Sequence, residues 1–176
     1  MPNYFSYFPK IYYDAVGAGN YKQVTHLLSR VQIKQGLKET GAFFDEYIVQ
    51  AGETPEILAE KFYGSMNYYW VILIFNNIKD RYYDWPLSQY DLEQYINDKY
   101  TNPNGVHHYE KVQDSGPQSS IDNSHIIEVS SDVAGATPVT NYEYEQREQL
   151  KKSRIRMLRP EFIDAFIEEF KGLLAV

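Results

Sequence analysis

The chain has 176 residues, a hydrophobic content of 43% and a formal net charge of −7. That hydrophobic content is enough to build a core, while the negative charge disfavours general binding to nucleic acid or to an anionic membrane. Cysteine is absent, which excludes disulfides and thiolate chemistry, and no apolar run approaches the roughly eighteen residues of a membrane span.

Tyrosine is unusually frequent, with 17 residues in a chain whose aromatic content is 16%. A tyrosine combines a large apolar ring with a hydroxyl group, so it is enriched where proteins meet. Sugar-binding surfaces use aromatic faces as well. The composition therefore leaves open whether the partner is a protein or a glycan.

Residues 1–46 are predicted to form an aromatic N-terminal arm followed by a short helix. Prolines and glycines interrupt the aromatic start, which argues against one long helix. An arm of this kind is expected to pack on the body of the protein or on another chain. Thr25 is predicted to cap the short helix, which has Leu27, Leu28 and Val31 on its inner face and ends near Gly36.

Residues 47–100 carry the most informative pattern. A short strand is predicted at residues 47–50, and Thr54 is placed to cap a helix that ends at Gly64. A second helix over residues 68–75 is apolar almost all round and is expected to be buried. A second strand is predicted at residues 81–85. The order is strand, helix, helix, strand, and a further helix begins at a Ser-x-x-Asp capping pattern.

Residues 101–176 are predicted to be strand-rich and to end in an amphipathic helix that starts at Pro160. No internal repeat is visible, which excludes a solenoid. The predicted elements before that helix are strands at 106–112 and 125–130, a loop at 135–140, a polar helix at 141–152 and a strand at 154–158.

Signatures of catalysis and of metal binding are missing from the sequence. His107 and His108 are neighbours on a predicted strand, so their side chains are expected to point to opposite faces. His107 could meet His125 across a hairpin, but the pattern offers no third ligand. Acidic neighbours such as Asp45 and Glu46 have no spacing that specifies a glycosidase. We therefore expect no enzyme, no cofactor and no metal.

The basic run over residues 147–159 stands out in an acidic chain. Its simpler interpretation is a solvated helix face followed by a strand. The alternative is a docking surface for an acidic partner.

Residues 47–64, Tyr-Ile-Val-Gln-Ala-Gly-Glu-Thr-Pro-Glu-Ile-Leu-Ala-Glu-Lys-Phe-Tyr-Gly, resemble the first half of a LysM module. The second half differs, because its helix reads Tyr-Tyr-Trp-Val-Ile-Leu-Ile-Phe and is followed by Tyr-Tyr-Asp-Trp-Pro at 82–86. This variant is similar to the LysM-like baseplate wedge subunit of T4-type contractile-tailed bacteriophages. The resemblance implies an α+β protein with a small LysM-like strand-helix-helix-strand module, an aromatic N-terminal arm and a C-terminal strand and helix extension.

The resemblance also implies a structural subunit of the virion, made in the host cytoplasm and assembled into the tail baseplate. Such a subunit joins neighbouring wedges around the hub by protein–protein contacts, in multiple copies of a hexagonal assembly. Its expected partners are other baseplate wedge proteins and the sheath-initiating subunit. Neither nucleic acid nor membrane is expected to bind.

Exposed aromatic side chains are the candidates for the protein interface. Tyr82, Tyr83 and Trp85 alternate on the predicted strand, so one face is expected to meet a partner. The other candidates are in the N-terminal arm, namely Tyr4, Phe5, Tyr7 and Phe8. By contrast, Tyr47, Tyr63 and Trp70 are expected to lie in the core of the module.

A glycan-binding LysM protein that recognises peptidoglycan or other N-acetylglucosamine polymers is the alternative. Two loops would then line a shallow groove, formed by Gly52, Glu53, Thr54, Pro55, Asn76, Asn77 and Ile78. The start of the chain lacks the features of a signal peptide, and no repeats are present, which argues against this function. A small wall hydrolase is disfavoured further, because no catalytic constellation is present.

Overall fold

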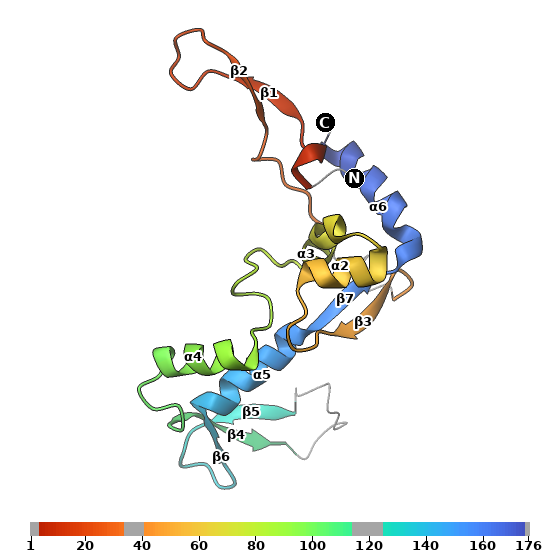
Figure 1. Ribbon diagram of the computed structural model, residues 1–176. Coiled ribbons are helices and arrows are strands. Elements are labelled where there is room, and N and C mark those ends of the chain that lie inside the picture. Colours follow the sequence, from red (N-terminus) through yellow and green to blue (C-terminus); the bar gives the residue numbers. More distant parts are fainter. Residues whose placement is uncertain (1–3, 34–40, 114–124, 175–176) are drawn as a thin grey trace. The chain divides into compact units, whose positions relative to one another are not determined.

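The computed structural model describes residues 4–33, 41–113 and 125–174. These residues form a mixed α+β fold with five α-helices and three small antiparallel sheets (Figure 1), which confirms the α+β part of the predicted fold. The chain divides into two compact units, Met1–Trp85 with Ser153–Val176 (unit 1) and Pro86–Lys152 (unit 2). Unit 2 is therefore one continuous stretch inserted into unit 1. The three segments expected from the sequence have different boundaries, and that division stays a prediction.

The N-terminal region begins with a 3-10 turn, η1 (Tyr4–Tyr7), and continues into a hairpin of β1 (Lys10–Tyr13) and β2 (Lys22–Thr25). The helix predicted to start at Thr25 is wrong, since Thr25 ends β2 and the residues up to 33 contain no helix. Pairing of β2 with β1 outweighs the local capping signal of one threonine. Gly36, where the helix was predicted to end, lies outside the described residues.

The first predicted helix is confirmed as α2 (Pro55–Tyr63). The strand predicted at residues 47–50 begins three residues earlier, as β3 (Phe44–Ile48), and shares residues 47 and 48 with it. The Thr54 hydroxyl accepts the N–H of Ile57 at 3.4 Å, which satisfies a donor of the first helical turn. Gly64 ends α2 with a φ of 69°, a left-handed conformation that glycine adopts without strain.

The second helix is also confirmed, as a short 3-10 turn η2 (Met66–Tyr68) that leads into α3 (Tyr69–Phe75). Trp70, Val71 and Ile72 are at most 2% exposed, as expected for a helix that is apolar on all sides. Asn77 follows with a φ of 56° and turns the chain.

The predicted second strand at residues 81–85 is wrong, because residues 81–83 form a turn. The Asp84 carboxylate accepts the N–H groups of Lys79 and Asp80, both at 3.0 Å, and this local bonding competes with an extended strand. The partner of β3 is instead β7 (Arg154–Leu158), which lies antiparallel with Phe44 opposite Leu158. A strand at 154–158 was expected, but its pairing was not.

The predicted C-terminal helix is confirmed as η3 (Pro160–Phe162) followed by α6 (Ile163–Leu174). Its buried residues are Ile163, Ile167, Phe170 and Leu174. Trp70 of α3 packs against Phe170 with ring centroids 4.7 Å apart, in the first core cluster of unit 1. A second cluster joins residues of α2, α3 and β7 with Trp85.

Unit 2 contains α4 (Gln89–Lys99), a sheet with the strand order β5-β4-β6, and α5 (Asn141–Ser153). Ser88 caps α4 through the N–H of Asp91 at 3.1 Å, as the sequence predicted. The strands are β4 (Val106–Val112), β5 (Ile126–Val129) and β6 (Thr137–Thr140). The loop predicted at 135–140 is thus wrong in part, because β6 pairs with β4. Pro138 lies on an edge strand, where the missing N–H is tolerated.

None of the helices in the described residues is both long and apolar enough to cross a membrane.

Candidate protein-interaction surfaces

The aromatic residues at the N-terminus pack mainly onto unit 1 itself. Phe8 is only 7% exposed, and Tyr4 and Tyr7 pack against the same core cluster, where both rings contact Trp70. Phe5 differs, since its side chain is 54% exposed. Of the four predicted interface residues in this region, Phe5 is therefore the one displayed to solvent.

The β1–β2 hairpin displays apolar side chains that the site prediction did not include. Tyr12 is 73% exposed, Val16 86% and Tyr21 68%. The connecting loop is ordered by Asp14, whose carboxylate accepts the N–H groups of Val16, Gly17 and Gly19. Desolvation opposes ionisation of Asp14, but these backbone hydrogen bonds outweigh it and lower its pKa. These hydrogen bonds connect Asp14 to the backbone of the loop, which has Val16 at its surface.

The turn at residues 80–85 displays two tyrosines and anchors a tryptophan. Tyr82 and Tyr83 are 79% and 70% exposed, whereas Trp85 is 7% exposed and belongs to the second core cluster. The Trp85 indole N–H donates to the carbonyl oxygen of Glu53 at 2.9 Å. Arg81 pairs with Glu56 of α2. Trp85 therefore fastens the turn to unit 1, and the two tyrosines face solvent.

The first loop of the alternative glycan groove uses its polar groups within the fold. The Glu53 carboxylate accepts the hydroxyl of Tyr47 at 2.9 Å, the N–H of Gln50 and the ammonium of Lys61 at 3.1 Å. Desolvation raises the pKa of Glu53, but these hydrogen bonds outweigh desolvation, so the pKa is lowered overall. Thr54 caps α2, and Pro55 is buried. Gly52 is exposed, but it has no side chain to offer a ligand.

The second loop of that groove also uses the polar side chain of Asn76 for hydrogen bonds within the fold. The Asn76 amide donates to the carbonyl of Ile72 at 2.9 Å and to that of Arg156 at 2.8 Å, and its oxygen accepts the Arg156 N–H at 2.7 Å. Asn76 therefore ties the end of α3 to β7. Ile78 packs against the second core cluster, and Asn77 is exposed.

A cleft of about 570 Å³ in unit 1 has an apolar lining. Side chains of α6, including Phe166 and Phe170, form one part of it, and Phe43, Phe75 and Leu158 form another. A sugar or catalytic site needs convergent polar groups among its lining residues. Here Gln32 and Glu169 are the polar residues of the lining, so the cleft does not resemble such a site.

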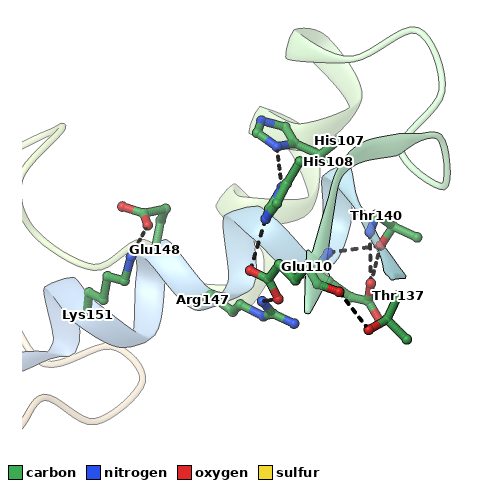
Figure 2. A network of polar contacts seen from close by, with 9 residues as sticks. His107, His108, Glu110, Thr137, Thr140, Arg147, Glu148 and Lys151 are labelled. Carbon is green, nitrogen blue, oxygen red and sulfur yellow. Dashed lines mark hydrogen bonds and ion pairs between the residues drawn. The ribbon is translucent and has the colours of Figure 1, made fainter. Parts of the chain in front are cut away.

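Unit 2 contains a polar network between β4 and α5, shown in Figure 2. Glu110 bonds His108 Nε2 at 2.9 Å with one carboxylate oxygen and Arg147 at 2.6 Å with the other. Desolvation raises the pKa of Glu110, but Arg147 and His108 outweigh it, so the pKa is lowered overall. These groups satisfy one another, which is typical of a structural network.

The two histidines of this network correct a prediction. His107 Nδ1 and His108 Nδ1 are 2.8 Å apart, so the side chains do not point to opposite faces. The register of β4 shifts between Val106 and His108, and this irregularity breaks the usual alternation. In the part of the chain that the structure describes, no three potential ligands converge to hold a metal.

Half of the six basic residues in the run at 147–159 form ion pairs within the chain. Arg147 pairs with Glu110, Lys151 with Glu148, and Arg159 with Asp45. Arg156 stacks over the Phe44 ring at 4.9 Å. These contacts favour the solvated face over a docking surface for an acidic partner.

Comparisons with known proteins show which family the chain belongs to. A family model described as base plate wedge protein 53 matches residues 4–119, well over half of the chain. Baseplate wedge protein gp53 of Enterobacteria phage T4 is 29% identical over 136 residues, which cover 70% of this chain and 69% of the relative. The chain therefore belongs to the base plate wedge protein 53 family and is a structural subunit of the phage tail baseplate, not an enzyme.

Proposed function

We propose that this subunit joins neighbouring wedges around the tail hub through two exposed surfaces of unit 1. The β1–β2 hairpin with Val16 at its loop is the first, and the pair Tyr82 and Tyr83 is the second. The observation that carries the proposal is the exposure of these large side chains on ordered turns, because aromatic anchors on rigid elements dominate protein interfaces. Phe5 adds a further exposed ring.

We also propose that β3, α2, α3 and β7 form the LysM-like module. The chain order is strand, helix, helix, strand, and the two strands are antiparallel. Asn76 joins the end of α3 to β7. The closing strand would then be β7 and not residues 81–85, with unit 2 inserted before it.

Other wedge proteins and the sheath-initiating subunit are the proposed partners, in a hexagonal assembly with several copies of this chain. Membership of the baseplate wedge family supports the other wedge proteins as partners. The apolar character of the exposed surfaces supports contacts with protein.

Co-expression with the other wedge subunits of the same phage tests the proposal. The wild-type chain should co-purify with them, and Tyr82→Ala with Tyr83→Ala should weaken the complex without unfolding the chain. The matched control is Tyr90→Ala, an equally exposed tyrosine on α4 of unit 2. If the double variant and the control bind like the wild type, the tyrosine pair is not an interface.

Glycan binding remains the alternative to be tested. Glu53, Asn76 and Trp85 use their polar groups inside the fold, which argues against a sugar groove. The purified chain should stay in the supernatant when peptidoglycan sacculi are sedimented. Clear sedimentation with the sacculi would contradict a function restricted to wedge assembly.

A further inference from the structure

The β3–β7 sheet, one of two two-stranded sheets in unit 1, has two edges that differ in their hydrogen bonding. In an antiparallel pair, alternate residues direct their N–H and C=O groups toward the partner strand, and the others direct them outward. Arg159 N–H donates to Phe43 O, and Val49 N–H donates to Ser153 O. With this register, Phe44, Glu46 and Ile48 direct their backbone groups away from β7.

The outer edge of β7 is closed by side chains of the same unit. The Asn76 amide bonds both the N–H and the C=O of Arg156, and the Tyr63 hydroxyl donates to Leu158 O at 2.9 Å. Burial raises the pKa of Tyr63, so its hydroxyl keeps its proton and remains a donor. No strand could be added on this side without displacing both groups.

The outer edge of β3 is open by comparison. Within the described part of the chain, one side-chain contact reaches it, from the Gln50 amide to Ile48 O at 2.8 Å. The outward N–H groups of Phe44, Glu46 and Ile48 have no acceptor among the described residues. Figure 1 shows β3 beside β7 as one pair of strands. An edge of this kind is a template for a further strand.

The side chains of β3 indicate what would bind there. Glu46 is acidic and exposed, Asp45 already pairs with Arg159, and Ile48 is 53% exposed. A second copy is disfavoured, because pairing the whole of β3 with itself would place Glu46 opposite Glu46, and like charges opposite each other are destabilising. A strand with a lysine or arginine opposite Glu46 and an apolar residue opposite Ile48 fits instead.

We propose that the free edge of β3 accepts an extended basic segment of another baseplate subunit as a third strand of this sheet. The inference rests on the proposed function and adds the mode of contact. Main-chain hydrogen bonds from Phe44, Glu46 and Ile48 provide affinity, and the Glu46 carboxylate selects a basic partner.

Substitution at Glu46 tests this proposal, because its N–H points away from β7. Glu46→Pro removes one outward donor and leaves the β3–β7 ladder intact, since proline is tolerated on a strand edge. Glu46→Thr keeps the donor and removes the charge. Affinity for the co-expressed wedge subunits should fall by about tenfold or more in the proline variant, and by less in the threonine variant.

Hydrogen exchange provides a second readout that does not depend on a substitution. The amides of Phe44, Glu46 and Ile48 should exchange fast in the free chain and slowly in the complex, while those of Asp45 and Tyr47 are protected in both. Tryptophan fluorescence reports folding of unit 1, because Trp70 and Trp85 lie in its core clusters.

The outcomes separate the two proposals. If the wild type joins the wedge subunits and Glu46→Pro joins equally well, the edge proposal is wrong and the proposed function stands. If the three amides are already protected in the free chain, another part of the chain covers the edge, which overturns the proposal as well. If the wild type does not associate with the wedge subunits, both proposals fail.

Discussion

Asn76 connects two elements that are far apart in the sequence, the end of α3 and strand β7. Replacing it with alanine leaves the N–H and C=O of Arg156 without these partners, while Ile72 O still accepts the backbone N–H of residue 76. Asn76→Ala should therefore lower the free energy of unfolding by about 1–3 kcal/mol, measured by urea denaturation followed by tryptophan fluorescence.

The neighbouring residue provides the control for this change. Asn77 has a positive φ of 56° and an exposed side chain, so Asn77→Gly should change stability by no more than about 0.5 kcal/mol. Equal losses in the two variants would show that the turn, and not the Asn76 amide, is the stabilising feature.

Glu145 is the buried carboxylate of unit 2, where Lys99 and the Tyr100 hydroxyl both bond it at 2.7 Å. Desolvation raises its pKa, but these two partners outweigh it, so the pKa is lowered overall. The stabilisation is therefore present above the pKa of an unfolded glutamate, about 4.3, and is lost as the pH falls through the lower folded-state value.

Glu145→Gln should lower the free energy of unfolding by about 1–2 kcal/mol at pH 7. This range is reduced because Lys99 is partly exposed and solvent screens the ion pair. The difference from the wild type should shrink as the pH falls below about 4.3, measured by urea denaturation followed by circular dichroism. Glu148→Gln, on the same helix but with a more exposed partner, should have a small effect. A loss that does not change with pH would contradict the assigned ion pair.

At the level of elements, the turn at residues 80–85 has a buried tryptophan that stabilises the fold and two tyrosines that are exposed to solvent. Trp85→Ala should destabilise unit 1 by about 3–5 kcal/mol, because a large buried ring and its hydrogen bond are lost. The free energy of unfolding of Tyr82→Ala should stay within about 0.5 kcal/mol of the wild-type value, since the ring is exposed. Thermal denaturation measures both. Similar losses in the two variants would mean that Tyr82 is part of the core.

The elements that could be predicted from the sequence are those specified by local chemistry. Thr54, Gly64 and Ser88 mark helix ends through contacts within a few residues, and each was identified. The pairing of β3 with β7 could not be predicted in this way, because unit 2 separates the strands and no local pattern links them. The strand expected at 81–85 failed since Asp84 closes a turn there.

In the candidate interface, too, some features follow from the local sequence and others depend on contacts with distant residues. Tyr82 and Tyr83 were identified from their aromatic character, but the sequence could not tell them from Trp85, which is buried by contacts with distant residues. The exposed hairpin was missed. Its signals were the β-branched pattern at 22–25 and an aspartate followed by two glycines, Asp14, Gly17 and Gly19, which form the loop.

At the level of the whole molecule, unit 2 is an insertion into unit 1. The two core clusters that contain the tryptophans are formed entirely by unit 1 residues. Replacing residues 86–152 with a flexible glycine and serine linker should therefore leave a cooperative unfolding transition by tryptophan fluorescence. Loss of that transition, with a long linker as well as a short one, would show that unit 1 depends on unit 2.

We propose that this subunit joins wedges to one another. Sedimentation velocity of wedges assembled from the other subunits of the same phage, with and without this chain, tests it most directly. We expect separate wedges in its absence and a larger closed assembly when the purified chain is added. Closed assemblies that form equally well without the chain would contradict it.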